Sequence, residues 1–100
     1  MTAMTVQWVQ WEWGVKMSHD LNSDWETIDS KKLKRVFKFK GFLKTMSFVN
    51  AVAWEANRQM HHPDMEVTFN TCTINITTHD EGNTLTDKDY KLAKGIDSLE

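Results

Sequence analysis

The chain has 100 residues, of which 40 % are hydrophobic and 26 % are charged, and its formal net charge is −2. This length allows one domain, and the composition excludes a disordered chain. The small net charge creates no overall field to attract nucleic acid or an anionic membrane, and no segment approaches the ~20 apolar residues of a membrane span. Cys72 is the one cysteine, and no secretory leader pattern is present. We therefore expect a protein of a reducing compartment, the cytoplasm, and presence in the nucleus is also compatible.

Residues 1–24 are interpreted as an N-terminal extension of a single domain that spans residues 25–100. The tryptophan-rich run at residues 6–13 fits neither a helical nor a strand period. A polar, turn-rich stretch follows it at residues 18–24.

Two strands are predicted next, at residues 25–29 and 33–40, joined by a turn. In the second strand one face carries Leu33, Phe37 and Phe39 and the other Lys34, Lys38 and Lys40, whereas Arg35 and Val36 break the alternation. No aromatic residues interleave with the lysines as stacking platforms, so this basic face is interpreted as a solvated sheet surface rather than a nucleic-acid site.

A helix is predicted over residues 42–60. Its apolar residues recur at three- or four-residue spacing and predict one buried stripe, made of Phe42, Met46, Val49, Ala53, Ala56 and Met60. The two methionines are interpreted as core filler. Pro63 ends the segment, so His61 and His62 are expected at a helix exit, where side chains can point into a cleft.

Further strands and a second helix complete the chain. Val67 and Phe69 alternate in one phase and Cys72, Ile74 and Ile76 in the other, which predicts two strands with a turn near residues 70–71. Cys72 falls on the apolar set and is expected to be buried and unreactive.

The last helix has a clear start signal. Thr86 and Asp89 form a capping-box pattern, and Leu92, Ile96 and Leu99 predict its buried stripe. The order of elements predicts an α+β domain with helices on one face of an antiparallel sheet.

Three of the four histidines lie in two short segments, His61-His62-Pro63 and Thr78-His79-Asp80. A dehydration needs one group to protonate a departing hydroxyl and another to remove a proton, and two imidazoles can do both near neutral pH. Two other interpretations stay open on spacing alone. The histidines are also zinc ligands, although adjacent His61 and His62 diverge in an extended backbone, and they can simply cap a helix and a strand.

At these residues the sequence resembles the pterin-4a-carbinolamine dehydratase family. The resemblance spans roughly residues 25–99, and His-His-Pro and Thr-His-Asp fall in the family's order and spacing. The matching pieces are Phe37-Lys38-Phe39, Phe42, Phe48, Val52-Ala53, His61-His62-Pro63, Phe69-Asn70, Thr77-Thr78-His79-Asp80, Leu85-Thr86, Asp89, Leu92-Ala93 and Ile96-Asp97.

The resemblance implies a two-layer β-β-α-β-β-α fold with a four-stranded antiparallel sheet, preceded by a helical N-terminal segment and assembled as a homodimer or homotetramer. It implies an enzyme that dehydrates 4a-hydroxytetrahydropterin, the product of aromatic amino acid hydroxylases, to quinonoid dihydropterin in tetrahydrobiopterin recycling. It implies neither a metal nor an organic cofactor, because the pterin is the substrate.

The resemblance also implies a role for each site residue. His61 and His79 would form the acid/base pair, and His62, next to Pro63, would bind and orient the pterin. Backbone groups around Thr77 and Thr78 would meet the amide edge of the pterin, and Asp80 would support His79.

One departure from the family concerns the position four residues before His61. The family usually has an acidic residue there, whereas this chain has Asn57, which cannot stabilise an imidazolium by charge. The competing hypothesis is a non-catalytic interaction protein on the same fold, since relatives serve as a dimerisation cofactor of a transcription factor or as assembly factors. Retention of all three histidines favours the enzyme.

Overall fold

The computed structural model describes residues 21–100. Residues 1–20 of the predicted N-terminal extension, where a helix was expected, lie outside the described residues. The elements in chain order are β2 (Glu26–Ile28), β3 (Lys32–Lys38), α1 (Phe42–Gln59), β4 (Asp64–Val67), β5 (Thr71–Ile76), a short 3₁₀ helix (His79–Glu81) and α2 (Asp87–Asp97). No helix within residues 21–100 is both long and apolar enough to cross a membrane.

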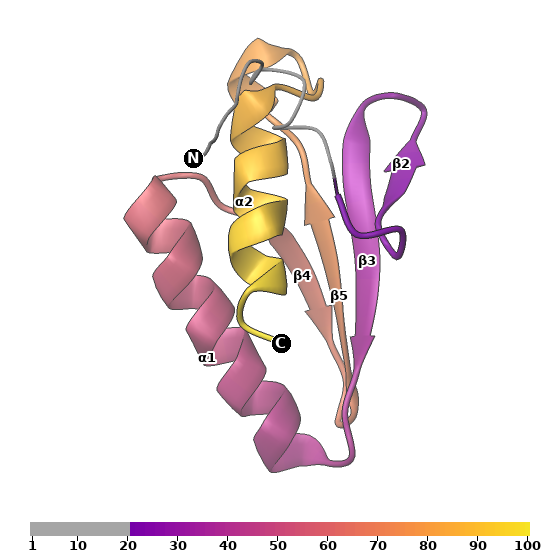
Figure 1. Ribbon diagram of the computed structural model, residues 1–100, viewed down its shortest axis with the longest axis vertical. Coiled ribbons are helices and arrows are strands. Elements are labelled where there is room, and N and C mark those ends of the chain that lie inside the picture. The colour runs from indigo at the N-terminus through magenta and orange to yellow at the C-terminus, as the bar shows by residue number, and fades with distance from the viewer. Residues whose placement is uncertain (1–20) are drawn as a thin grey trace, which may run out of the picture.

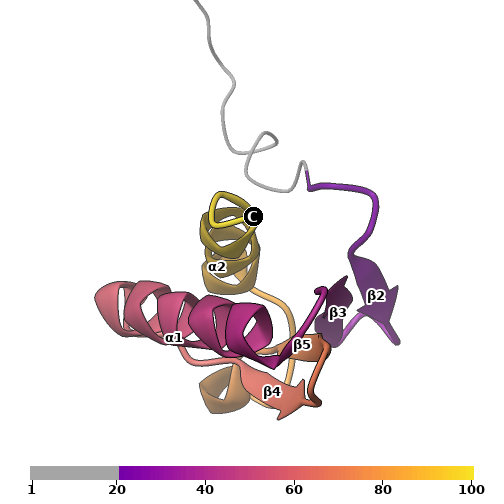
Figure 2. The same ribbon diagram turned by 90° about the horizontal axis from the view of Figure 1, so that it is seen from below.

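The four strands form one antiparallel sheet in the order β2-β3-β5-β4. Within residues 21–100, both helices lie on the same side of this sheet and none lies on the other (Figures 1 and 2). This arrangement confirms the predicted α+β architecture and the helices on one face.

The core lies between the sheet and the helices. Its fully buried members come from two central strands and both helices, and include Leu33, Cys72, Ile74, Ile76, Val52, Leu92 and Ile96. On β5 every second side chain points inward, as the sequence predicted.

Arg35 does not break the alternation of β3, contrary to the sequence interpretation. Its side chain occupies an inward position between Leu33 and Phe37 and is only 6 % exposed. The guanidinium pairs at 2.6 Å with Asp97, the last residue of α2, and at 2.9 Å with Glu100, three residues beyond it. These carboxylates allow a charged group to occupy a core-facing position.

The buried face of α1 also differs from the predicted stripe. The buried residues are Thr45, Phe48, Val52 and Ala56, whereas Phe42 and Met60 are exposed. Two sets of residues with helical spacing overlap on this helix, and the set that faces the core includes a polar residue, Thr45. The Thr45 hydroxyl lies 2.9 Å from the carbonyl oxygens of both Gly41 and Phe69, so its single proton has an acceptor in the interior.

Cys72 is fully buried, as predicted, and burial raises the pKa of its thiol above the ordinary value. We expect the native protein to resist a thiol-specific reagent at neutral pH, because both access and the thiolate population are low. The same reagent should modify the thiol rapidly in concentrated urea. Fast, stoichiometric modification without denaturant would contradict this burial.

Candidate active site

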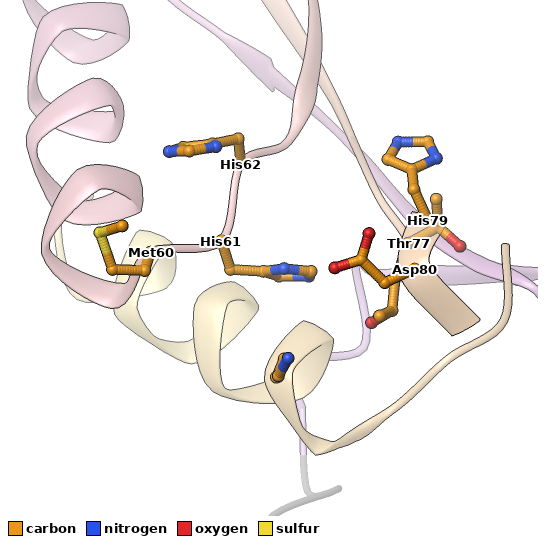
Figure 3. A pocket seen from close by; sticks show the side chains of 8 residues that line it. Met60, His61, His62, Thr77, His79 and Asp80 are labelled. Atoms are coloured by element: carbon orange, nitrogen blue, oxygen red, sulfur yellow. The ribbon is translucent and has the colours of Figure 1, made fainter. Parts of the chain in front are cut away.

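A recess forms where α1 ends and β5 ends. It has a volume of about 180 Å³ and is lined by Met60, His61, His62, Thr77, Thr78, His79, Asp80 and Lys88 (Figure 3). We call it the histidine recess. It brings together six of the seven residues assigned to the site from the sequence. Pro63 is not among the lining residues.

The end of α1 places the first two histidines. Met60 adopts a left-handed conformation, with φ 56° and ψ 37°, and the helix stops there. The His61 N–H donates to the Ala56 carbonyl at 3.2 Å, which closes the turn. Pro63 then leads the chain into β4, and the rings of His61 and His62 diverge (Figure 3).

His61 is held by a carboxylate that lies 28 positions further along the chain. Its Nε2 hydrogen-bonds Oδ1 of Asp89 at 2.6 Å. The His61 side chain is 12 % exposed and that of Asp89 is 0 % exposed. An ionised carboxylate can only accept, so Nε2 donates in this contact, and the bond fixes the orientation of the ring.

The second oxygen of Asp89 anchors the start of α2. Oδ2 accepts the Thr86 N–H at 2.7 Å and the Thr78 hydroxyl at 2.8 Å. The first of these bonds confirms the capping-box prediction. The sequence pattern attributed Asp89 to the cap alone and missed its contact with the histidine, because nothing in the local spacing indicates that contact.

His79 begins the 3₁₀ helix after β5 and has different partners. Its Nδ1 lies 2.7 Å from Oδ1 of Asn83, and its Nε2 lies 3.8 Å from Oδ2 of Asp64. The amide oxygen of Asn83 can only accept, so the ring donates to it through Nδ1. Asn83 therefore orients this ring, in the role that the sequence interpretation gave to Asp80. The loop that contains Asn83 carried no signal of this role.

Asn57 does not take part in the histidine recess. The α-helix ends at Gln59, so the chain has already turned when it reaches His61. The Asn57 side chain is exposed and lines a separate hollow on the outside of α1, together with Trp54. In this chain the carboxylate that meets His61 is Asp89.

The hydroxyls of the two threonines of the site are both engaged in hydrogen bonds within the protein. The Thr78 side chain is buried against Asp89, and its backbone N–H donates to the Thr84 carbonyl at 3.1 Å. The Thr77 hydroxyl donates to the Lys31 carbonyl at 2.6 Å. Both residues line the recess, but these donors already have partners within the protein.

Two lining residues were not expected from the sequence. Met60 was interpreted as core filler but is 77 % exposed, and Lys88 lies in the first turn of α2. Within residues 21–100, no three His, Cys, Asp or Glu side chains converge as ligands of one metal ion.

Comparison with known proteins shows which class this fold and site define. Residues 11–99 match the sequence model of the family described as pterin 4 alpha carbinolamine dehydratase. A protein of Legionella pneumophila (strain Corby) is 50 % identical over 80 residues, which cover 79 % of this chain and 70 % of that protein. A protein of Picosynechococcus sp. is 45 % identical over 76 residues, which cover 76 % and 80 % of the two chains. Both carry the name pterin-4-alpha-carbinolamine dehydratase provisionally.

Solved structures agree with this assignment. A transcriptional coactivator/pterin dehydratase from Brucella melitensis superposes with a TM-score of 0.71 at 30 % identity, covering 76 % of this chain and 81 % of the other. A pterin dehydratase-like protein, identified as a RuBisCO assembly factor in the alpha-carboxysome, shares the fold at 18 % identity with a TM-score of 0.65, covering 82 % of this chain and 92 % of that one. The chain belongs to the pterin-4a-carbinolamine dehydratase family.

Proposed function

We propose that this protein is an active lyase that dehydrates 4a-hydroxytetrahydropterin to quinonoid dihydropterin and water. The C4a–O bond breaks as the hydroxyl receives a proton, N5 loses its proton, and the N5–C4a double bond forms. One proton donor and one proton acceptor suffice, so the reaction needs neither a metal nor an organic cofactor. We place this activity in the cytoplasm, as the single cysteine suggests.

The observation that carries the proposal is that His61 and His79 line one recess and that each ring has its own hydrogen-bond partner, Asp89 for His61 and Asn83 for His79. The carboxylate of Asp89 stabilises a protonated His61, which suits a general acid that protonates the 4a-hydroxyl. In the neutral ring of His79, with Nδ1 donating to Asn83, Nε2 is the nitrogen that can accept the N5 proton as a general base. The sequence indicated the pair without assigning the two roles.

The remaining lining residues would bind and orient the substrate. The exposed ring of His62 diverges from His61 and offers a face and a ring nitrogen to a flat heterocycle. Asp80 and Thr77 stand across the recess from it (Figure 3) and offer polar groups to the pterin amide edge.

The direct test follows the decay of 4a-hydroxytetrahydropterin generated by an aromatic amino acid hydroxylase. The purified protein should accelerate this decay in proportion to its concentration. A rate equal to the uncatalysed decay, from protein that is folded by circular dichroism, would reject the proposed activity.

The alternative function, a non-catalytic interaction protein, is compatible with the same fold. The Brucella relative is described as a coactivator as well as a dehydratase, and the assembly factor has the same architecture. Retention of His61, His62 and His79 favours the enzyme. The turnover measurement separates these alternatives, and a dual role requires turnover as well.

We also propose that the chain forms a homodimer or homotetramer. The strand β4 is an edge of the sheet, and the outer face of α1 exposes Leu43 at 79 % and Trp54 at 77 %. Small residues, Ser47, Ala51 and Ala53, lie between these two side chains along the helix. A large apolar residue beside small ones allows two copies of the helix to approach closely by a two-fold axis.

Light scattering at micromolar concentration should give the mass of a dimer or tetramer. Trp54→Lys should lower this mass, because an interfacial tryptophan commonly contributes about 2–4 kcal/mol to association. The control Val36→Thr alters an apolar residue that is also exposed, but on the open sheet face. A monomeric wild type contradicts the assembly, and an unchanged mass for Trp54→Lys excludes this face.

A further inference from the structure

The contact between His61 and Asp89 joins two helices that are separate in the sequence. His61 follows the end of α1, and Asp89 lies in the first turn of α2. The two helices lie side by side on the sheet and contact each other (Figures 1 and 2). The 2.6 Å distance from His61 Nε2 to Asp89 Oδ1 therefore depends on how the last turn of α1 is held against α2.

A polar contact ties the two helices together beside this pair. Nε2 of Gln59 donates to the Lys91 carbonyl at 3.4 Å. Gln59 precedes His61 by two residues, and Lys91 follows Asp89 by two residues. The same amide nitrogen also donates to Oε2 of Glu55, so each of its two hydrogens has an acceptor. Because both neighbours only accept, the nitrogen rather than the oxygen of the amide must face them.

Glu55 is itself fixed on the surface of α1. Its Oε2 accepts from the Arg58 guanidinium at 2.6 Å and its Oε1 at 3.2 Å. The hydrogen bonds from Arg58 and then from Gln59 lower the pKa of Glu55 below its ordinary value, so the carboxylate is ionised at neutral pH. The Glu55 side chain is only 11 % exposed. An ionised, half-enclosed carboxylate thus holds the Gln59 amide in one orientation.

Gly95 provides the space for this arrangement. A Cβ atom at residue 95 would lie 2.6 Å from Nε2 of Gln59 and closer still to Oε2 of Glu55, so a side chain there would push both groups away from α2. Residue 95 lies one turn after Lys91, and its N–H is the helical donor to the Lys91 carbonyl. The missing side chain leaves that carbonyl accessible to a second donor.

We propose that Glu55 and Gln59 are positioning residues for His61, the proposed general acid. They hold the last turn of α1 against α2 through the space that Gly95 leaves, and so set the distance from His61 to Asp89. The inference rests on the proposed function for the role of His61. Neither Glu55 nor Gln59 lines the histidine recess, so both act through His61 rather than on the substrate.

The kinetics of two variants test the inference. Gln59→Ala removes the tie and should lower kcat by about tenfold, part of the ~10²-fold or more that a correctly placed general acid contributes. KM should stay within about twofold, because the substrate does not meet this side chain. Gly95→Ala should lower kcat by a similar factor, since the added Cβ displaces Glu55 and Gln59. Its resistance to urea should nevertheless be unchanged or higher, because Ala is a better helix former than Gly.

Two further variants serve as controls. Asn57→Ala removes another amide from the last turn of α1, but this side chain is exposed on the outside of the helix, so kcat should equal that of the wild type. Glu55→Gln retains an oxygen that accepts from Gln59, so it should keep most of the turnover that Glu55→Ala loses. A merely structural role would instead make kcat fall only in variants that are less stable to urea.

An NMR measurement tests the inference without turnover. The nitrogen resonance of His61 Nε2 reports its hydrogen bond to Asp89, and Asp89→Asn gives the position of that resonance without the carboxylate. In Gln59→Ala and in Gly95→Ala the resonance should move toward this position, whereas Asn57→Ala should leave it in place.

An unmoved resonance in both variants would overturn the inference, as would wild-type kcat in both. Failure of the proposed function is a separate result. If the wild type does not accelerate dehydration, the resonance alone decides whether Glu55 and Gln59 position His61.

Discussion

Asp89→Asn should reduce turnover by at least ~10²-fold, the typical contribution of a general acid. The substitution keeps the shape of the side chain but removes the charge that stabilises protonated His61 across the 2.6 Å contact. The amide also replaces one of the two acceptor oxygens by an NH2 group, either the one that contacts His61 or the one that accepts from Thr78 and Thr86. We therefore expect a loss of about 1–3 kcal/mol in the free energy of unfolding, measured in urea.

Asp87→Asn is the control for Asp89→Asn. Asp87 lies two residues earlier in the same first turn of α2 and is exposed, so both variants remove one negative charge near the helix N-terminus. Asp87→Asn should retain most of the turnover and stability. If Asp89→Asn keeps wild-type turnover, His61 does not depend on this carboxylate, and its role as the acid loses its support.

Replacing either His61 or His79 by Ala should cost on the order of 10²-fold or more in turnover. The double variant should lose much less than the product of the two single losses, because both imidazoles serve the same step. His62→Ala should differ in kind and raise KM more than it lowers kcat, since His62 is expected to orient the substrate. Turnover like that of the wild type in both single variants would remove the proposed acid/base pair.

A chelator provides a further check on this histidine series. EDTA should leave turnover unchanged, because the proposed reaction uses imidazoles alone. Activity that disappears with EDTA and returns with zinc would instead support the metal interpretation that the sequence left open.

Elements with a strong local pattern were predictable from the sequence. The inward set of β5, the turn that precedes it and the capping box of α2 all depend on residues within a few positions of each other. The buried stripe of α1 was wrong, because two overlapping stripes have similar spacing. Only a tertiary contact, the bond from the Thr45 hydroxyl to the Phe69 carbonyl, shows which of them faces the sheet.

The candidate site was predictable in its histidines but not in their partners. His61, His62 and His79 stood out by residue type and by the family resemblance. Asp89 is 28 positions from His61, and Asn83 lies in a loop whose conformation depends on left-handed residues at 82 and 83. Such pairings depend on how the elements pack, which a one-dimensional pattern does not contain. The sequence therefore predicted most of the residues that line the recess, but not the carboxylate and the amide that contact its two histidines.

The carboxylate of Asp89 joins the chemistry of the recess to the integrity of a helix. One of its oxygens contacts the imidazole of His61 and the other accepts the main-chain N–H of Thr86. If His61 loses its proton, or if a ligand displaces its ring, the charge on the Asp89 carboxylate is redistributed. The strength of the hydrogen bond from the Thr86 N–H then changes. The amide resonance of Thr86 should therefore shift in an NMR titration and report events in the recess from a nucleus that touches no substrate. Fraying of the first turn of α2 would also move Asp89 away from His61, so the proposed general acid would lose its partner before the domain unfolds.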